Sequence, residues 1–269
     1  MRIAQLRVVK VAETRFVLPD DLASPWAVWE TDAEDDASAL VEFAGRACYG
    51  SWSRPNPATR SNPAYIGHIL NQEHFSVLEH AGFTVMLTGV SRSLTHELTR
   101  HRHLSHSQRS QRFVNEDDTP VIVPPLFRDD PDAQAVIAEI YERTQEAYRK
   151  LAEIGARKLA ALSDKTLRRK RVREAARCVL PNMTETHIVV SGNHRAWREF
   201  FSKRGGLHVD AEMREVVITI FREVAQPLAP AIYRDFRLRT VALDSAETVE
   251  VLEQGPALMD AAAVTGRRT

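Results

Sequence analysis

The sequence predicts an α/β (α+β) fold, because strand-like and helix-like patterns alternate along it. Residues 83–88 alternate between apolar and more polar side chains, a period of two that is typical of a half-buried strand. Apolar residues within 131–151 and within 213–224 recur instead with helical spacing. The chain contains no internal repeat, so we expect strands and several long helices within one domain.

The first eighty residues combine one strand, two loops and two helices. Residues 6–16 are rich in β-branched and apolar side chains, which predicts a strand. Residues 19–36 are acidic and irregular, and residues 51–63 contain three prolines, so we expect loops in both places. Apolar spacing predicts helices over residues 38–49 and 65–70.

The centre of the chain contains a strand followed by a short helix. Val90, Leu94 and Leu98 recur every four residues after the strand at 83–88, which predicts a helix. That helix ends near Arg100, where a cation suits the helix dipole. We expect the polar residues from Ser105 onward to run extended, and residues 121–123 to form a short strand.

The second half is predicted to be mainly helical. Pro131 follows two aspartates at an expected first helical position, and Asn193 is a suitable N-cap. The predicted elements are helices over 131–151, 165–180, 193–200 and 209–225 and a strand over 187–190. We interpret the basic residues within 165–177 as mostly a solvated face. Beyond Leu238 little periodicity is visible, and we expect residues 266–269 to fray.

Composition limits the classes of function. Thirty-six basic residues balance thirty-six acidic ones, so the chain as a whole has no long-range attraction for nucleic acid. The two cysteines, Cys48 and Cys178, form no CxxC pair, which argues against a disulfide framework and a cysteine zinc site. The N-terminus lacks an apolar leader and no stretch reaches the length of a membrane span, so we expect a cytoplasmic protein with no membrane partner.

Residues 100–112 are the most unusual stretch of the sequence. They comprise four arginines, three histidines, three serines, two glutamines and a single apolar residue, Leu104. Such a segment cannot form part of an apolar core, and arginine offers a planar fork of donors to phosphate or carboxylate oxygens. The segment is therefore either a basic surface stretch or one wall of a pocket for phosphorylated ligands.

The pattern Arg100-His101-Arg102, seven further residues and Ser110 resembles the signature of the flavin-dependent thymidylate synthases. The flanking residues His103, Gln108, Gln111 and Arg112 fit this signature too. Similarity continues in order through residues 43–49, 74–80, 176–181 and 193–208, and it covers about residues 40–235. We therefore divide the chain into an N-terminal strand and acidic loop (1–37), a family domain (38–238) and a C-terminal tail (239–269).

The resemblance implies a fold, an assembly and a reaction. The fold is a mixed sheet flanked by helices, and the assembly is a homotetramer with active sites between subunits. The reaction is the reductive methylation of dUMP to dTMP, in which methylenetetrahydrofolate donates the one-carbon unit and FAD reduced by NADPH supplies the hydride. All these ligands carry phosphate or carboxylate groups, which arginine forks and helix termini can bind. In such a tetramer, part of the apolar face of residues 209–225 would form an interface.

The resemblance also implies site residues, position by position. Those expected to bind the cofactor FAD are Ser76, Glu79, Arg100, His101, Arg102, His103, Asn193, Arg195 and His208. Those expected to bind the uracil nucleotide are Glu97, Gln108, Arg109, Ser110, Gln111, Arg112, Arg177 and Arg204. The catalytic candidates are His74, Ser110 and Arg204, and Lys170 is a weaker candidate near the flavin and folate.

Several of these residues have simpler explanations. Asn193 could act as a helix cap alone, His74 could be an ordinary half-buried imidazole, and Arg204 could extend from an apolar face to solvent. The histidines of residues 101–106 could suggest zinc, but the neighbouring arginines would repel a metal ion. We therefore expect no metal site.

The route by which uracil is activated depends on which nucleophiles are available. Cys178 follows Arg177 on a predicted helix and is expected to face the core, and Cys48 is expected to be a small packed residue. Ser110 needs an adjacent base to become a nucleophile. We therefore expect Ser110 to bind the nucleotide, and the hydride to pass directly from reduced flavin to the uracil ring.

Three positions depart from the family pattern. Arg109 stands where an apolar residue is expected, Glu97 stands where some relatives have glutamine, and residues 205–207 (Gly-Gly-Leu) replace a more polar segment. The glycine pair is expected to loosen the chain before His208.

Two other functions compete with this interpretation. One is a flavoprotein that methylates uracil in RNA, which would need a long basic groove that the balanced charge disfavours. The other is a non-enzymatic nucleic-acid-binding protein that clamps phosphates with residues 100–112 and 165–177. That alternative does not explain the family spacing of residues 74–80 and 193–195.

Overall fold

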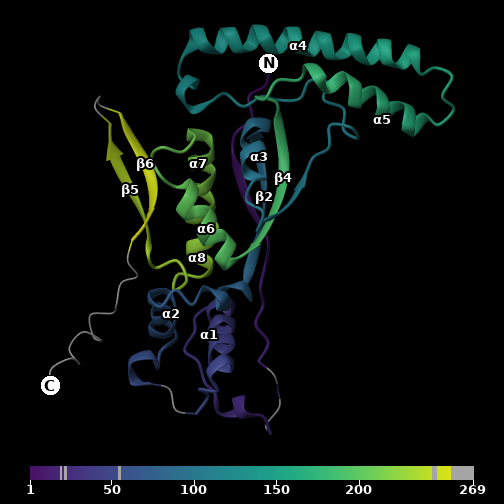
Figure 1. Cartoon of the computed structure of the whole chain (residues 1–269). Coiled ribbons are helices and arrows are strands. Elements are labelled where there is room, and N and C mark those ends of the chain that lie inside the picture. The colour runs from purple at the N-terminus through teal and green to yellow at the C-terminus, as the bar shows by residue number, and fades with distance from the viewer. Residues whose placement is uncertain (19, 21–22, 54–55, 244–246, 256–269) are drawn as a thin grey trace. The chain divides into compact units, whose positions relative to one another are not determined.

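The computed structural model describes residues 1–18, 20, 23–53, 56–243 and 247–255 (Figure 1). These residues form two compact units. The first unit comprises residues 1–9, 86–102 and 106–190. The second unit comprises the described residues within 10–85, 103–105 and 191–269.

A four-stranded sheet has the order β1-β2-β4-β3. Its strands are β1 (Arg7–Glu13), β2 (Gly82–Ser91), β3 (Ser105–Gln108) and β4 (Glu185–Asn193). Strands β2 and β4 are antiparallel, because Arg92 N–H donates to Thr184 O at one end and His194 N–H donates to Ala81 O at the other. A parallel bridge joins Ile3 to Val121. The α+β class predicted from the sequence is confirmed, as is the alternation of buried residues in β2.

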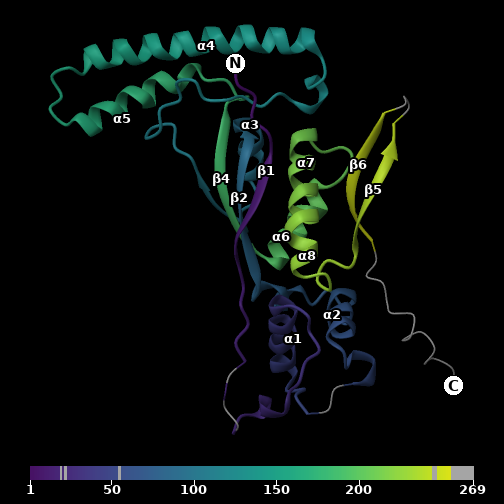
Figure 2. The same cartoon turned by 180° about the vertical axis from the view of Figure 1, so that it is seen from behind.

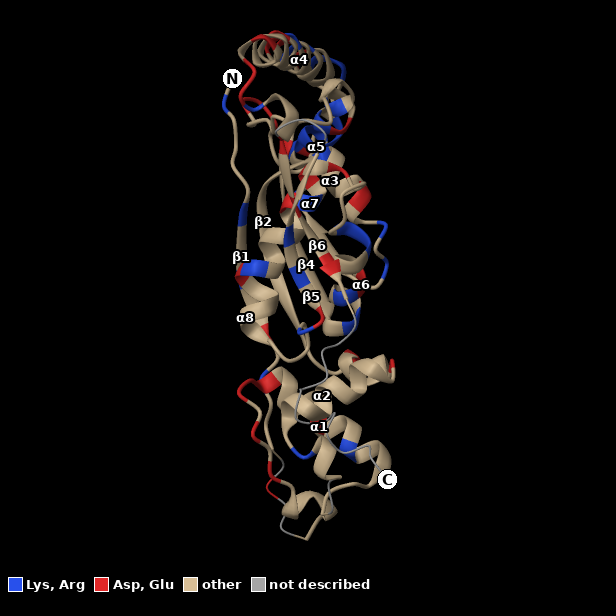
Figure 3. Ribbon diagram, turned by 90° about the vertical axis from the view of Figure 1, so that its left-hand side faces the viewer, with Lys and Arg blue, Asp and Glu red and all other residues tan. Residues whose placement is uncertain are grey.

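The helices of the first unit are α3 (Arg92–Leu98), α4 (Pro131–Lys158) and α5 (Lys165–Ala176). Asp130 caps α4 and Pro131 occupies its first turn, as predicted. The helices α4 and α5 lie side by side (Figures 1 and 2). Figure 3 shows the Lys and Arg residues along α5, most of whose residues are exposed, which confirms a solvated basic face.

The helices of the second unit are α1 (Asp36–Tyr49), α2 (Asn62–Asn71), α6 (His194–Arg204), α7 (Ala211–Ile220) and α8 (Gln226–Leu228). A π-helical segment, Phe221–Ala225, continues α7. The core is aromatic, and its fully buried rings are Trp197, Phe200, Phe201, Phe221 and Tyr233. The apolar face of residues 209–225 is buried within this one chain, through Met213, Val216, Val217, Ile220, Phe221 and Val224. This face therefore needs no partner chain to cover it.

A C-terminal hairpin is the main element that the sequence does not predict. Strands β5 (Phe236–Ala242) and β6 (Thr248–Gln254) pair antiparallel, with Phe236 opposite Gln254. Figure 1 shows β6 beside α7. The alternation of apolar and charged residues in each strand, as in Phe236-Arg237-Leu238-Arg239, covers only a few positions and gives a weak pattern. The expected fraying of residues 266–269 lies outside the described residues.

Two smaller features also differ from expectation. Residues 121–123 are buried but form a bridge at Val121 rather than a strand. The loops predicted at 19–36 and 51–63 each contain a short 3-10 turn, Pro25–Val28 and Pro57–Thr59. No helix in the described part of the chain is long and apolar enough to cross a bilayer.

Candidate functional site

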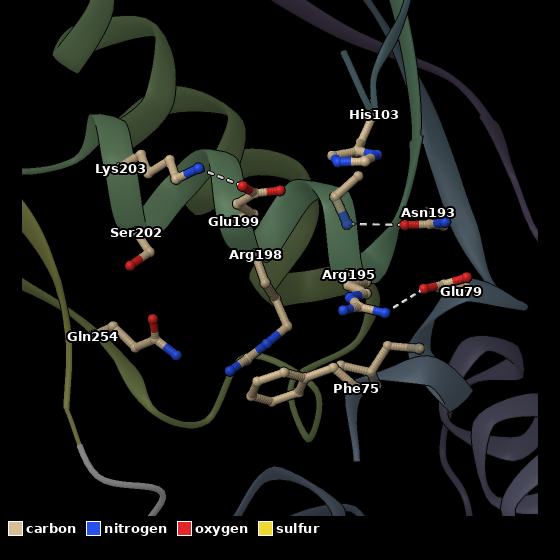
Figure 4. Close-up of a pocket in the computed structure, with 12 residues that line it drawn as sticks. Phe75, Glu79, His103, Asn193, Arg195, Arg198, Glu199, Ser202, Lys203 and Gln254 are labelled. Atoms are coloured by element: carbon tan, nitrogen blue, oxygen red, sulfur yellow. Dashed lines mark hydrogen bonds and ion pairs between the residues drawn. The ribbon is translucent and has the colours of Figure 1, made fainter. Parts of the chain in front are cut away.

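A cavity of the second unit lies along one side of α6 and has a volume of about 680 Å³ (Figure 4). This volume is in the usual range for small-molecule and cofactor sites, ~300–1,000 Å³. Its lining residues come from the 3-10 turn Phe75–Glu79, from His103, from Asn193 and the length of α6, and from the end of β6. They are Phe75, Leu78, Glu79, His103, Asn193, Arg195, Ala196, Arg198, Glu199, Ser202, Lys203 and Gln254.

Helix α6 sets the positions of most polar groups in this cavity. Asn193 caps the helix, because its side-chain oxygen accepts a hydrogen bond of 2.8 Å from Ala196 N–H. Arg195, Glu199 and Lys203 follow one another every four residues and so share one helical face. Figure 4 shows Arg195 reaching toward Glu79 on the 3-10 turn.

The cations of the cavity all have acidic partners. Arg195 pairs with Glu79 and Lys203 pairs with Glu199, and these four side chains are about half exposed. Arg198 forms a buried two-pronged pair with Asp235, at 2.7 and 2.6 Å. Exposed pairs contribute little free energy and exchange readily, whereas breaking a buried pair is costly. Arg195 and Lys203 are therefore available to an anionic ligand, and Arg198 is held as part of the wall.

A smaller cavity of about 330 Å³ in the same unit contains His74. Its lining includes Cys48 and Tyr49 from the end of α1, Ser76, and Arg195, which the two cavities share. The rings of Tyr49 and His74 stack, with centroids 6.5 Å apart and an interplanar angle of 27°. A flat ligand could extend this stack.

A buried polar network holds α1 against α2 behind this cavity. Arg46 donates to Glu42 at 2.7 Å, and the amide of Asn62 donates to the same carboxylate at 2.9 Å. The Arg46 guanidinium also lies over the Tyr65 ring, 4.6 Å from its centroid. Burial raises the pKa of Tyr65 to about 12. Tyr49 thus projects from a helix whose preceding turn is fixed.

The first unit has its own polar pocket, with a volume of about 280 Å³. The pocket lies where α3, the end of β3 and residues 180–182 meet, and its residues are Arg92, Thr95, His96, Thr99, Gln108, Gln111, Leu180, Pro181 and Asn182. Gln108 donates to Thr95 Oγ1 at 2.8 Å, which leaves its amide oxygen available. Arg92 Nε is buried and has no hydrogen-bond partner among the described residues. The pocket thus combines amide and hydroxyl groups with a cation, a set that suits a heterocycle bearing an anionic group.

Comparison with known proteins identifies the family. The family model described as thymidylate synthase complementing protein matches residues 30–231. A flavin-dependent thymidylate synthase of Mycobacteroides abscessus is 50% identical over 240 residues, which are 89% of this chain and 93% of that protein. One from Mycobacterium tuberculosis strain H37Ra is 49% identical over 239 residues, with the same coverage of both chains.

The chain belongs to the flavin-dependent thymidylate synthase family. The resemblance noted in residues 100–112 is therefore confirmed. A solved structure, the UMP/dUMP methylase PolB of Streptomyces cacaoi bound with 5-Br dUMP, has the same fold. It superposes with a TM-score of 0.64 at 18% identity, covering 87% of this chain and 95% of that one.

The flavin-dependent thymidylate synthase residues predicted in the second unit fall into two groups. Six of them line its cavities, namely His74, Ser76, Glu79, His103, Asn193 and Arg195. Arg204, in the last turn of α6, and His208 line neither of these cavities. His208 is exposed.

In the first unit, Gln108 and Gln111 line the pocket. The arginines next to them in sequence form ion pairs with glutamates. Arg109 faces the carboxylates of Glu116 and Glu185. Arg112 Nε pairs with Glu174 at 2.7 Å. Ser110 Oγ accepts from Arg112 N–H at 3.3 Å, and no described histidine or carboxylate bonds to it. This environment suits a serine that binds rather than attacks.

The remaining predicted residues of the first unit line none of these cavities. They are Glu97, Arg100, His101, Arg102, Lys170 and Arg177, of which Arg100, Arg102 and Arg177 are exposed. The ammonium of Lys170 lies over the Phe113 ring, 5.0 Å from its centroid.

Both cysteines differ from expectation, because both are exposed. Cys178 lies in a 3-10 turn, Arg177–Val179, that follows α5, so the α-helical spacing used to place it in the core does not apply. Cys48 lies in the exposed last turn of α1 and lines the His74 cavity. The expectations that Cys178 faces the core and that Cys48 is a packed residue are therefore wrong.

Several cavity residues are not predicted from the sequence, among them Arg92, Arg198, Ser202, Lys203 and Gln254. The spacing of four residues from Arg195 through Glu199 to Lys203, and from Arg198 to Ser202, could have identified the three on α6. Gln254 lies in the unpredicted hairpin, and no local signal marks it.

Proposed function

We propose that this chain converts dUMP to dTMP by reductive methylation, with methylenetetrahydrofolate as the one-carbon donor and NADPH as the reductant. The observation that carries the proposal is the convergence of four family positions, Glu79, His103, Asn193 and Arg195, on one cavity of the second unit. Residues 38–238 form the catalytic domain in this proposal, and the two free cysteines suit a reducing cytoplasm.

The cavity of the second unit fits FAD in size and in its donor groups. Phe75 and Leu78 offer apolar surface to a ring, while Arg195 and Lys203 offer cationic donors to a pyrophosphate. When bound, the flavin supplies the hydride. Phosphate oxygens would displace Glu79 from Arg195, because that exposed pair is weak. His74 and Tyr49 would extend the site as a stacking platform for a flat ring of the folate or nicotinamide.

The pocket of the first unit fits the uracil nucleotide. The amides of Gln108 and Gln111 match the donors and acceptors of a uracil edge, and the Arg92 guanidinium matches a phosphate. Ser110 is expected to hold the nucleotide without attacking it. Cys48 and Cys178 are not needed as nucleophiles in this scheme, because reduction at the ring does not require a covalent enzyme adduct.

The active enzyme is proposed to be a homotetramer with shared sites. Several family positions, including exposed Arg100, Arg102, Arg177 and His208, line neither cavity within the described single chain. A second copy could bring these groups to the ligands. Arg204, as a candidate for nucleotide binding and catalysis, is included in this shared set.

Two single substitutions test the assignment of ligands to cavities. Arg195→Ala removes a phosphate donor and is expected to weaken FAD binding about tenfold or more, as read from flavin absorbance during titration. Gln111→Ala is expected to weaken dUMP binding by about tenfold while FAD binding stays unchanged. Arg222→Ala is the matched control, because Arg222 forms an exposed pair with Glu250 and lines neither cavity. Unchanged FAD binding in Arg195→Ala would contradict the assignment of the cavity.

A further inference from the structure

Arg109 lies directly beside the nucleotide pocket but does not line it. In strand β3 the neighbouring Gln108 points into the pocket, and alternation along a strand sends the next side chain the other way. The Arg109 backbone N–H donates to His187 O at 2.9 Å, which ties the end of β3 to β4. The role of this arginine therefore depends on what its side chain meets on the opposite face.

The Arg109 guanidinium meets two buried carboxylates. One of its nitrogens donates to Glu116 Oε2 at 3.2 Å and to the carbonyl oxygen of Glu185 at 3.1 Å. The other lies 3.5 Å from Glu185 Oε2. The side chain of Glu116 is fully buried and that of Glu185 is 4% exposed. Buried carboxylates need a cation nearby, so Arg109 is the main neutralising charge for this pair.

Arg92 connects the same carboxylates to the pocket. Its Nη2 donates to the backbone oxygen of Arg109 at 2.8 Å and lies 3.9 Å from Glu116 Oε1. Glu116 Oε1 has no hydrogen-bond partner among the described residues. Arg92 also lines the nucleotide pocket. The Arg92 guanidinium is therefore shared between the pocket and a carboxylate that Arg109 already neutralises.

We propose that Arg109 is a positioning residue, which neutralises Glu116 and Glu185 so that Arg92 stays directed at the nucleotide pocket. Without the Arg109 guanidinium, Arg92 is the cation among the described residues that remains paired with Glu116, at 3.9 Å. A small movement would turn the present separation into a direct ion pair and draw Arg92 from the pocket. This inference rests on the proposed function of the pocket as the dUMP site, and it replaces the expectation that Arg109 contacts the nucleotide.

The test uses dUMP titration of the FAD-loaded enzyme and steady-state kinetics. Arg109→Leu is expected to raise the Kd and KM for dUMP about tenfold or more, with kcat at saturating dUMP and flavin absorbance nearly unchanged. Arg109→Leu combined with Glu116→Gln is expected to restore dUMP affinity toward that of the wild type, because Arg92 is no longer drawn to a carboxylate. Arg149→Leu is the matched control, because Arg149 forms an exposed ion pair with Asp117 in the same unit.

The outcomes separate a positioning role from the alternatives. Unchanged dUMP affinity in Arg109→Leu would overturn the proposal. Failure of the Glu116→Gln substitution to restore affinity would also overturn it, and would indicate direct contact between Arg109 and the nucleotide. If Arg109→Leu does not fold, Arg109→Lys keeps a positive charge beside Glu116, so dUMP affinity close to that of the wild type is expected, and a tenfold loss of affinity in that variant would overturn the neutralising role. Unchanged dUMP affinity in Gln111→Ala would instead contradict the pocket assignment itself.

Discussion

His194, the first residue of α6, shows how strongly burial acts on a single side chain. It has no exposed surface, and its Nδ1 lies 2.7 Å from the hydroxyl of Tyr233. Its Nε2 has no partner among the described residues. Burial, with the nearby Arg198 charge, lowers the pKa of His194 to about 3. The imidazole therefore stays neutral in the folded protein at physiological pH.

This burial predicts a pH dependence of stability. In the unfolded chain the His194 pKa returns to about 6.5, so below that pH the unfolded state binds one proton more than the folded state. The free energy of unfolding should fall by about 1.4 kcal/mol per pH unit as pH drops below ~6.5, and this contribution should be constant above it. Urea unfolding of wild type and His194→Gln between about pH 7.5 and 5 measures the difference. Equal slopes for the two proteins would contradict the prediction.

At the scale of elements, the contact between the C-terminal end of α6 and strand β6 depends on a glycine. A Cβ at Gly205 would lie 2.6 Å from the Leu252 carbonyl oxygen and 2.7 Å from its Cβ. Leu252 N–H also donates to Gly205 O at 2.9 Å. Gly205 is expected from the sequence to loosen the chain, but it instead allows the backbones of α6 and β6 to approach closely. This approach places Gln254 of the hairpin in the cavity wall.

Two adjacent glycines provide a matched test of this contact. Gly205→Ala is expected to reduce the free energy of unfolding by about 1–3 kcal/mol through overpacking against Leu252, and to weaken FAD binding by shifting the hairpin. Gly206→Ala is the control, because a Cβ at Gly206 meets no atom within 4 Å. Urea unfolding followed by FAD titration measures both effects. Equal stability of the two variants would show that β6 does not pack this closely.

Local patterns predict the elements better than they predict the contacts between them. The alternation of Phe83, Val85 and Leu87, the cap at Asn193 and the start at Pro131 are all local, and the structure confirms them. The hairpin β5–β6 is not predicted because its alternation of apolar and charged residues is short, and because β6 packs on α6 and α7, which are distant in sequence.

The candidate site is predictable to a similar extent. Gln108 is predicted because it belongs to the family signature at residues 100–112, and Arg195 because it lies in another short segment that resembles the family. The partners of Arg109 lie 7 and 76 residues away and can be recognised only in the folded chain. For this reason the sequence predicts a nucleotide-binding Arg109, whereas its side chain faces two carboxylates.

At the scale of the whole molecule, we propose that one type of chain carries both a flavin site and a nucleotide site and couples them in a single reaction. The second unit holds the cavity proposed to bind FAD, and the first unit holds the pocket proposed to bind dUMP. Family membership supports the coupling of these ligands in thymidylate synthesis. Binding measurements on each cavity separately cannot test that coupling, so the decisive experiment must follow turnover.

The most direct test is reoxidation of the reduced flavin without oxygen. The purified protein is loaded with FAD and reduced with NADPH, and its visible absorbance is followed while dUMP and methylenetetrahydrofolate are added singly and together. We expect reoxidation when both are present, with formation of dTMP, and none with either one alone. A protein that takes up no FAD, or a reduced flavin that is not reoxidised when both substrates are present, would contradict the account.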